Sequence, residues 1–238
     1  MSEIVAIIPA RGGSKGLPNK NILDLCGYPL IYWSIKFAMS RDEIKKIIVS
    51  TDSQEIANIS LSYGAEVPFL RSTDLATDNA SSADVILDVI SRCKLHDSDI
   101  IVFLEPTSPY RDTLDFCKLL DLLNNYKAEK VMSVSEAVCS SFMFQYHRSD
   151  EQAGKLSPVF PENNFTTVRR QDLSKSYFLD GTFYASIVRS FIENPTFLDT
   201  KTHSLIPNPL SSFEVDSFFD LQLYRSIFQF FGPPEWSK

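Results

Sequence analysis

The chain has 238 residues, a hydrophobic fraction of 44% and a formal net charge of −7. This length and composition predict one large α/β domain with a sizeable core. The acidic balance argues against a nucleic-acid groove, which needs a basic patch that the sequence lacks. No apolar run reaches the ~18 residues of a membrane span, and the N-terminus lacks the features of a signal peptide. We therefore expect a cytoplasmic protein that binds neither nucleic acids nor membranes.

Strand-like and helix-like segments alternate through the first half of the chain. Apolar runs predict strands at residues 4–8, 45–50, 66–69, 99–104 and 130–134. Apolar residues at helical spacing predict helices at residues 30–39, 53–63, 82–93 and 112–124. This alternation predicts a doubly wound, mostly parallel sheet with helices on both faces. Ligands of such sheets bind beyond the carboxyl ends of the strands.

The second half of the chain contains a segment of a different kind. Periodicity weakens over residues 139–171, where aromatic residues are frequent. Aromatic residues in an irregular segment often mark an association surface. A strand at residues 177–188 and a last helix at residues 217–230 then return to the earlier pattern. Without internal repeats or a flexible linker, we expect a single domain over residues 1–238 with an inserted segment at 139–171.

The strand at residues 4–8 leads into a loop that is rich in glycine and carries the cations Arg11, Lys15 and Lys20. Glycine lets the backbone turn tightly and bring N–H groups close to a ligand. Exposed amides and spaced cations together predict a polyphosphate site. The loop lacks the Gly-Lys-Ser/Thr ending of Walker A and the Gly-x-Gly-x-x-Gly pattern of dinucleotide sites, which disfavours a P-loop kinase or ATPase.

Motifs further along the chain repeat the order known from one family. The glycine-rich loop is followed by Ile48-Val49-Ser50-Thr51-Asp52, Leu75-Ala76-Thr77-Asp78 with Ala80-Ser81-Ser82, Glu105-Pro106-Thr107-Ser108-Pro109-Tyr110-Arg111, Arg170-Gln171 and Asp216. In this order the motifs resemble the bacterial cytidylyltransferases that activate sialic-acid-type sugars, including the legionaminate and pseudaminate enzymes. Five ordered matches are far more specific than any single one.

The resemblance has direct implications for fold and function. It implies a Rossmann-like fold of the nucleotide-diphospho-sugar transferase type. It implies transfer of CMP from CTP to the anomeric hydroxyl of a nonulosonate, with release of pyrophosphate. It also implies that residues 139–171 form a dimerisation arm, so that the protein is a homodimer.

The resemblance assigns residues to the nucleotide. The matching positions are Ala10, Arg11, Gly12, Gly13, Ser14, Lys15, Asn21, Arg71, Ala80 and Ser82. We expect Arg11, Lys15 and Lys20 to hold the triphosphate and to act as catalytic residues together with Asp216. Arginine can grip two phosphate oxygens at once, whereas lysine acts as a point charge. Taken alone, Ser81 and Ser82 are equally good N-caps for the helix that follows.

A magnesium ion is the implied cofactor, because nucleotidyl transfer needs a divalent cation with hard oxygen ligands on the phosphates. Glu214 and Asp216 lie two residues apart, and alternation along an extended segment places both carboxylates on one side. The family carries Asp-x-Asp here, so Glu214 is a departure. The alternative is that these acids cap the following helix.

The resemblance also assigns the acceptor site. The matching positions are Glu105, Thr107, Arg170, Gln171 and Asp180. A guanidinium fork matches a carboxylate, so Arg170 is the expected partner of the sugar acid. The sialate enzymes usually have Gln at position 105 and Asn at position 180. These departures argue against assigning N-acetylneuraminate by analogy, so the acceptor stays open among the nonulosonates.

Two other functions remain open from the sequence. A 3-deoxy-octulosonate (Kdo) cytidylyltransferase resembles the first loop, although it usually lacks the Lys-Gly-Leu-Pro-Asn-Lys-Asn form seen at residues 15–21. A non-catalytic nucleotide-binding protein is the second alternative, because Glu214, Glu105 and Asp180 depart from the family pattern. Pyrophosphate release distinguishes an enzyme from a binding module.

Overall fold

The computed structural model describes residues 2–14, 16–77, 79–137, 144–146, 155–159 and 175–237. The chain divides into two compact units, of which the first comprises Met1–Val134 with Asp180–Lys238 and the second comprises Ser135–Leu179. In the second unit, the strands β7 (Phe144–Tyr146) and β8 (Leu156–Pro158) pair antiparallel. Most of residues 139–171 lie outside the described residues, so the dimerisation arm stays a prediction.

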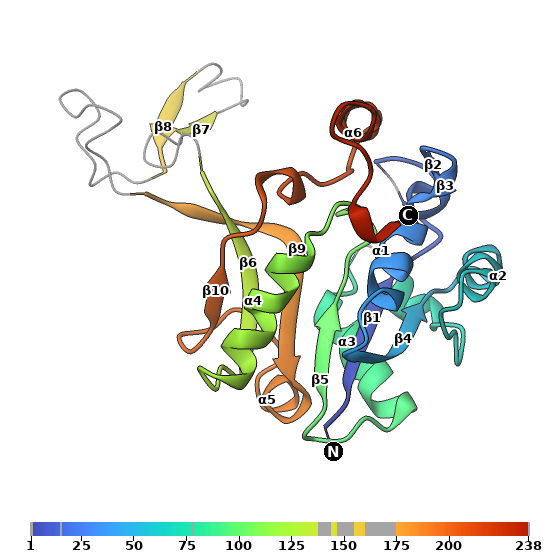
Figure 1. Cartoon of the computed structure of the whole chain (residues 1–238), viewed down its shortest axis with the longest axis vertical. Helices are drawn as coiled ribbons and strands as arrows, with labels where there is room; N and C mark the ends of the chain where they lie inside the picture. The colour runs from blue at the N-terminus through green and yellow to red at the C-terminus, as the bar shows by residue number, and fades with distance from the viewer. Residues whose placement is uncertain are drawn as a thin grey trace. The chain divides into compact units, whose positions relative to one another are not determined.

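A six-stranded sheet organises the first unit, in the order β10-β6-β9-β5-β1-β4 (Figure 1). Its strands are β1 (Ile4–Pro9), β4 (Ile44–Ser50), β5 (Ile100–Phe103), β6 (Lys130–Glu136), β9 (Tyr177–Ile187) and β10 (His203–Leu205). β1 runs parallel to β4 and β5, and β10 runs parallel to β6, whereas β9 is antiparallel to β5. The predicted doubly wound, mostly parallel sheet is therefore confirmed.

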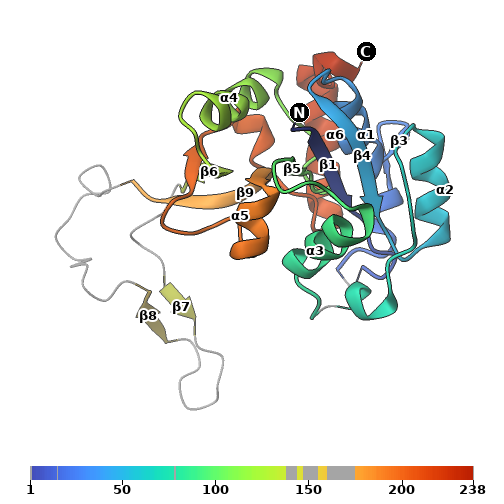
Figure 2. The same ribbon diagram turned by 90° about the horizontal axis from the view of Figure 1, so that it is seen from below.

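Helices cover both faces of this sheet (Figure 2). α1 (Leu30–Met39) and α4 (Thr113–Asn124) cover one face, and α3 (Ser82–Cys93) and α5 (Val188–Glu193) cover the other. The other α-helices of the described residues are α2 (Gln54–Ser62) and α6 (Phe218–Phe231). Ser53 caps α2, because its hydroxyl accepts a hydrogen bond from the Ile56 amide at 3.4 Å. A short hairpin of β2 (Asp24–Leu25) and β3 (Tyr28–Pro29) precedes α1. Among the described residues, no helix combines the length and apolarity needed to cross a membrane.

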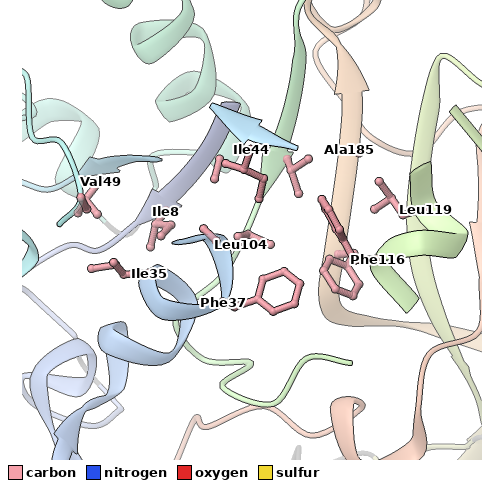
Figure 3. Packing of buried hydrophobic residues seen from close by; sticks show 14 of the residues in the cluster. Ile8, Ile35, Phe37, Ile44, Val49, Leu104, Phe116, Leu119 and Ala185 are labelled. Carbon is pink, nitrogen blue, oxygen red and sulfur yellow. The ribbon is translucent and has the colours of Figure 1, made fainter. Parts of the chain in front are cut away.

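The side chains of β1 alternate between two hydrophobic clusters, one on each face of the sheet. Ala6 and Ile8 belong to the cluster that α1 and α4 cover, and Val5 and Ile7 to the cluster that α3 and α5 cover. Figure 3 shows the first cluster, in which Phe37 of α1 meets Phe116 of α4. These two rings lie edge to face with their centroids 5.7 Å apart. Such aromatic pairs add about 0.5–1.5 kcal/mol beyond the burial of their area.

One predicted strand is not formed as expected. Over residues 66–69 the structure has only isolated bridges, which pair Glu66 with Ile48 and Leu70 with Thr51. Pro68 lies between them and has no N–H to donate, so a continuous ladder cannot form there. The bridges still bring the chain to the carboxyl end of β4, which places Arg71 at that edge of the sheet.

Candidate active site

The glycine-rich loop is anchored to the carboxyl end of β4. The Ala10 amide donates to the Ser50 carbonyl at 2.9 Å, and the Gly12 amide donates to Oδ1 of Asp52 at 2.9 Å. Asn21 is 7% exposed and its side-chain amide donates to the Arg11 carbonyl at 3.0 Å. Asn21 therefore supports the loop backbone that carries Arg11. Lys15 lies outside the described residues.

The loop glycines serve close approach rather than unusual backbone angles. Gly12, Gly13 and Gly16 are absent from the residues with positive φ. A Cβ on Gly12 would lie 3.1 Å from Cβ of Ser53, so a side chain would push the loop away from the start of α2. A Cβ on Gly13 would meet nothing within 4 Å. Of the three, Gly12 has the closest packing, and their part in tight turns stays a prediction.

Arg71 is the buried cation of the nucleotide side of the site. It is 6% exposed, and its Nε and Nη2 have no hydrogen-bond partner among the described residues. Burial lowers the pKa of Arg71, Asp52 opposes this shift, and the positive charge of Arg11 adds to it. These three side chains are thus close enough to interact. A buried guanidinium with unused donors is unfavourable without a ligand that accepts from it.

The segment before α3 caps that helix. The Ser81 hydroxyl accepts from the Asp84 amide at 3.1 Å, and the Asp84 carboxylate accepts from the Ser81 amide at 3.3 Å. The alternative that Ser81 is an N-cap is therefore confirmed, and Ser82 is the exposed first residue of the helix. Ala80 is half-buried next to it. Asp78 lies outside the described residues.

Lys20 and Asp216 bring the glycine-rich loop together with the segment before α6. Lys20 Nζ lies 2.9 Å from Oδ1 of Asp216. A Cβ on Gly16 would lie 3.4 Å from the Asp216 carbonyl oxygen, so the loop backbone also approaches this segment. The alternative that Glu214 or Asp216 caps α6 is wrong, because the N-cap is Ser217, whose hydroxyl accepts from the Asp220 amide at 3.3 Å.

Three carboxylates line the same side of the site. The pKa of Glu105 is raised to about 7, mainly by burial and then by the charges of Glu214 and Asp216, while Arg111 and Lys20 oppose the shift. Burial and the charge of Asp216 raise the pKa of Glu214. The site thus concentrates negative charge, which a divalent cation or a donor-rich ligand would relieve.

The Glu214 carboxylate lies against Gly181 in β9. Gly181 has a φ of +72°, and a Cβ at this position would overlap Oε1 of Glu214. Asp180, which precedes it, is 1% exposed and its Oδ1 accepts hydrogen bonds from the Ser133 hydroxyl and from the Thr182 amide. Oδ1 of Asp180 therefore links β9 to β6 and stabilises the sheet.

The loop after β5 contacts the segment that carries the acids. The Val215 amide donates to the Thr107 carbonyl at 2.8 Å, which aligns Glu214 and Asp216 with this loop although they are not in a named strand. Arg170 and Gln171 lie outside the described residues. The sequence motifs did not lead to a role for Arg111. Its place after a buried strand and two prolines could have indicated a functional cation.

The donors available for a cation are carboxylates. Glu214 and Asp216 interact electrostatically, and the residue between them, Val215, is buried. Among the described residues, no group of three or more His, Cys, Asp or Glu side chains is arranged to hold a metal ion. Mg²⁺ usually binds through one or two carboxylates together with substrate phosphates, so the pair fits this cation in kind.

Comparisons with known proteins agree with this site. The sequence model of a family described as cytidylyltransferase matches residues 5–202. CMP-N,N'-diacetyllegionaminic acid synthase of Legionella pneumophila is 34% identical over 230 residues, which cover 95% of this chain and 97% of that protein. N-acylneuraminate cytidylyltransferase of Escherichia coli is 33% identical over 231 residues, which cover 96% of this chain and 52% of that longer protein.

Among solved structures, CMP:2-keto-3-deoxy-manno-octonic acid synthetase in complex with CTP has a TM-score of 0.68. It is 19% identical in sequence, and the match covers 96% of this chain and 99% of that chain. At this identity the likeness concerns the fold alone. The resemblance drawn from the sequence motifs is confirmed by the family model and by the two sequence relatives.

Proposed function

We propose that this chain, which belongs to the cytidylyltransferase family, transfers CMP from CTP to the anomeric hydroxyl of a sialic-acid-like nonulosonate and releases pyrophosphate. Family membership makes the protein a nucleotidyltransferase. The relatives named for legionaminic and acylneuraminic acids support a sugar acid of this class as the acceptor.

The main observation in support of this proposal is that Nε and Nη2 of Arg71 lack hydrogen-bond acceptors in the described part of the chain. Two buried guanidinium nitrogens have no partner among the described residues, beside a loop that carries Arg11. Cytosine presents a carbonyl and a ring nitrogen that can accept from such donors. Binding of the nucleotide would thus satisfy polar groups that are otherwise buried without a partner, which favours the bound state.

The triphosphate is proposed to lie along the glycine-rich loop. Arg11, Lys15 and Lys20 supply positive charge, and the amides of Gly13 and Ser14 are proposed as additional donors. Cations at the phosphates stabilise the charge that builds up on the leaving pyrophosphate. Lys20 already pairs with Asp216, so phosphate binding would exchange or share this partner.

Asp216 and Glu214 are proposed to hold Mg²⁺ together with the phosphates. When bound, this cation would neutralise phosphate charge and act as a Lewis acid. Asp216 is the more accessible of the two, with a side chain that is 67% exposed. Glu214 is half-buried, and its carboxylate packs against Gly181.

The acceptor is proposed to bind beyond β5. Glu105 and Thr107 follow the end of that strand. Arg170 and Gln171 are proposed to contact the acceptor as well, on the basis of the sequence resemblance. Because the pKa of Glu105 is about 7, this side chain is partly protonated at neutral pH and can both donate and accept hydrogen bonds. A homodimer in the cytoplasm, with residues 139–171 as the arm, completes the proposal.

Product formation from a panel of acceptors tests the proposal. CTP and Mg²⁺ are supplied with N-acetylneuraminate, legionaminate, pseudaminate or Kdo, and CMP-sugars are detected by mass spectrometry. We expect a CMP-ester with one of the three nonulosonates. Product with Kdo alone would instead support the octulosonate enzyme. CTP binding without any product would support the non-catalytic protein.

A further inference from the structure

Arg111 is a charged side chain buried in the centre of the first unit. Its relative exposure is 0%, and it is among the largest fully buried side chains of the described residues. Burial lowers its pKa to about 10, while Tyr224, Glu105 and Glu214 oppose this shift. The guanidinium therefore remains positively charged at neutral pH. Because no part of it is exposed, Arg111 cannot touch CTP or an acceptor directly.

The guanidinium joins three elements that meet beneath the site. Nε donates to the Thr182 carbonyl of β9 at 2.9 Å, and Nη1 donates to the Ser34 hydroxyl of α1 at 2.9 Å. Nη2 donates to the Glu105 carbonyl after β5 at 2.8 Å. The Ser34 hydroxyl also donates to the Glu105 carbonyl, at 3.1 Å. The planar, forked guanidinium suits three acceptors in fixed directions, which a single ammonium group cannot match.

The Glu105 carbonyl is the point through which Arg111 reaches the site. It accepts from the Ser108 amide at 3.2 Å as well, so the first turn of the loop is closed around it. Two residues further along, the Thr107 carbonyl accepts from the Val215 amide. Hydrogen bonds at the Glu105 and Thr107 carbonyls, together with the backbone between them, thus connect Arg111 to the segment of Glu214 and Asp216.

The charge of Arg111 also balances the acids around it. Glu105, Glu214 and Asp180 all interact favourably with the guanidinium, because each of them raises the pKa of Arg111. Without a buried cation, these carboxylates would repel one another in a poorly solvated region. Removing the positive charge would therefore disturb the positions of Glu105 and Glu214 as well as the loop backbone.

We propose that Arg111 is a positioning residue for the acceptor site, which fixes the Glu105–Thr107 loop and, through it, the Glu214–Asp216 segment. This inference rests on the proposed function for its kinetic consequence. The structural part, an ordered loop that depends on Arg111, does not. The glycine-rich loop has an additional anchor of its own, through Asp52 after the end of β4.

Lys130 provides a matched control for a buried cation without this connection. It is 3% exposed at the first residue of β6, and its Nζ contacts Oδ2 of Asp199 at 2.8 Å and the Asn194 carbonyl at 3.0 Å. Neither Asp199 nor Asn194 belongs to the site. Lys130→Met should therefore lower stability in the way that loss of any buried, paired cation does.

The experiment compares wild type, Arg111→Met, Arg111→Lys and Lys130→Met. We expect Arg111→Met to raise the KM for the acceptor about tenfold or more and to lower kcat, because small misplacements at a reacting centre cost up to about 100-fold. The KM for CTP should rise less than the KM for the acceptor, because the glycine-rich loop keeps its own anchor, whereas the Glu214–Asp216 segment serves both substrates. Arg111→Lys should recover part of the activity that Arg111→Met loses, since lysine restores the positive charge but not the forked geometry of the guanidinium. Lys130→Met should change neither KM.

Amide hydrogen exchange gives a readout that does not need activity. Exchange at the Ser108 and Val215 amides should rise in Arg111→Met relative to the amides of α3, and should not do so in Lys130→Met. Ser34→Ala gives the same comparison if Arg111→Met does not fold. Equal behaviour of the Arg111 and Lys130 variants in both readouts would overturn the inference. Absence of wild-type turnover with all acceptors would instead refute the proposed function, while the exchange data would still decide the role of Arg111.

Discussion

The carboxylate of Glu214 occupies the space that a side chain at Gly181 would need, so the absence of a Cβ in β9 admits this acid into the site. The two residues lie 33 positions apart in the sequence and come together only in the folded sheet. Gly181 also has a φ of +72°, in the region that favours glycine.

Gly181→Ala should therefore displace Glu214 and strain the backbone. We expect a loss of stability of roughly 1–3 kcal/mol from the positive φ, together with a large loss of turnover. Thermal unfolding and pyrophosphate release measure the two effects. Gly232→Ala is the matched control, because Gly232 has a φ of +81° and a Cβ there would meet nothing within 4 Å. If both variants keep turnover equally well, Glu214 has no role in catalysis.

Glu105→Gln should change how stability depends on pH. The pKa of Glu105 is raised from 4.5 to about 7, so the stabilisation from its protonated form is complete at low pH and is lost as pH rises through about 7. Glutamine stays neutral, so this variant should be more stable than wild type at pH 8 by roughly 1–3 kcal/mol, and nearly equal to it at pH 4. Unfolding by urea at several pH values measures the difference.

The control for this experiment is Glu43→Gln, which removes an exposed carboxylate just before β4, at the end of that strand opposite to the anchored loop. That variant should follow the wild-type pH dependence. A Glu105→Gln curve parallel to wild type between pH 4 and pH 8 would mean that Glu105 is not perturbed by burial.

Asp216→Asn should reduce activity without unfolding the protein. The Asp216 side chain is 67% exposed, and its pair with Lys20 is expected to contribute only about 0–1 kcal/mol to stability. We expect either a higher Mg²⁺ concentration for half-maximal turnover or complete loss of turnover. Titration of Mg²⁺ in the pyrophosphate assay measures this. Asp24→Asn, at another exposed acid that lies 3.7 Å from an arginine, should leave the Mg²⁺ dependence unchanged.

Arg71→Met should weaken nucleotide binding but not destabilise the protein without ligand. The substitution removes two buried donors that have no partner among the described residues. A hydrogen bond to a charged group contributes about 1.5–3 kcal/mol, so CTP affinity should fall by about 10- to 100-fold. Calorimetric titration with CTP checks this, and Arg189→Met, at an arginine that is 60% exposed, is the control. Unchanged CTP affinity in Arg71→Met would place the nucleotide elsewhere.

Much of the fold could be predicted from apolar patterns alone. The helix at residues 30–39 and the helix at residues 82–93 have the predicted bounds, because caps and periodicity are local properties. The prediction of a strand at residues 66–69 failed, because Pro68 lacks the N–H that a continuous ladder needs, although its neighbours favour a strand. The short helix α5 and the short strand β10 have too few residues to produce a periodic signal.

The site was predictable in its residue types and less so in its contacts. The cations of the loop, Arg71 and the two acids before α6 followed from motifs in order. The support of the loop by Asn21, the space at Gly181 and the burial of Arg111 depend on long-range packing. No local pattern encodes which carbonyl a buried guanidinium will meet, so these relationships required the folded structure.

Pyrophosphate release by wild type and Arg11→Ala, with CTP, Mg²⁺ and each nonulosonate, tests the central claim most directly. Arg11→Ala removes a proposed phosphate cation that is not part of the hydrophobic core. Transfer of CMP predicts acceptor-dependent pyrophosphate release by wild type, and at least about a 100-fold loss in the variant with its melting temperature retained. Equal release by both proteins, or CTP binding by wild type without release under any condition, would contradict the claim.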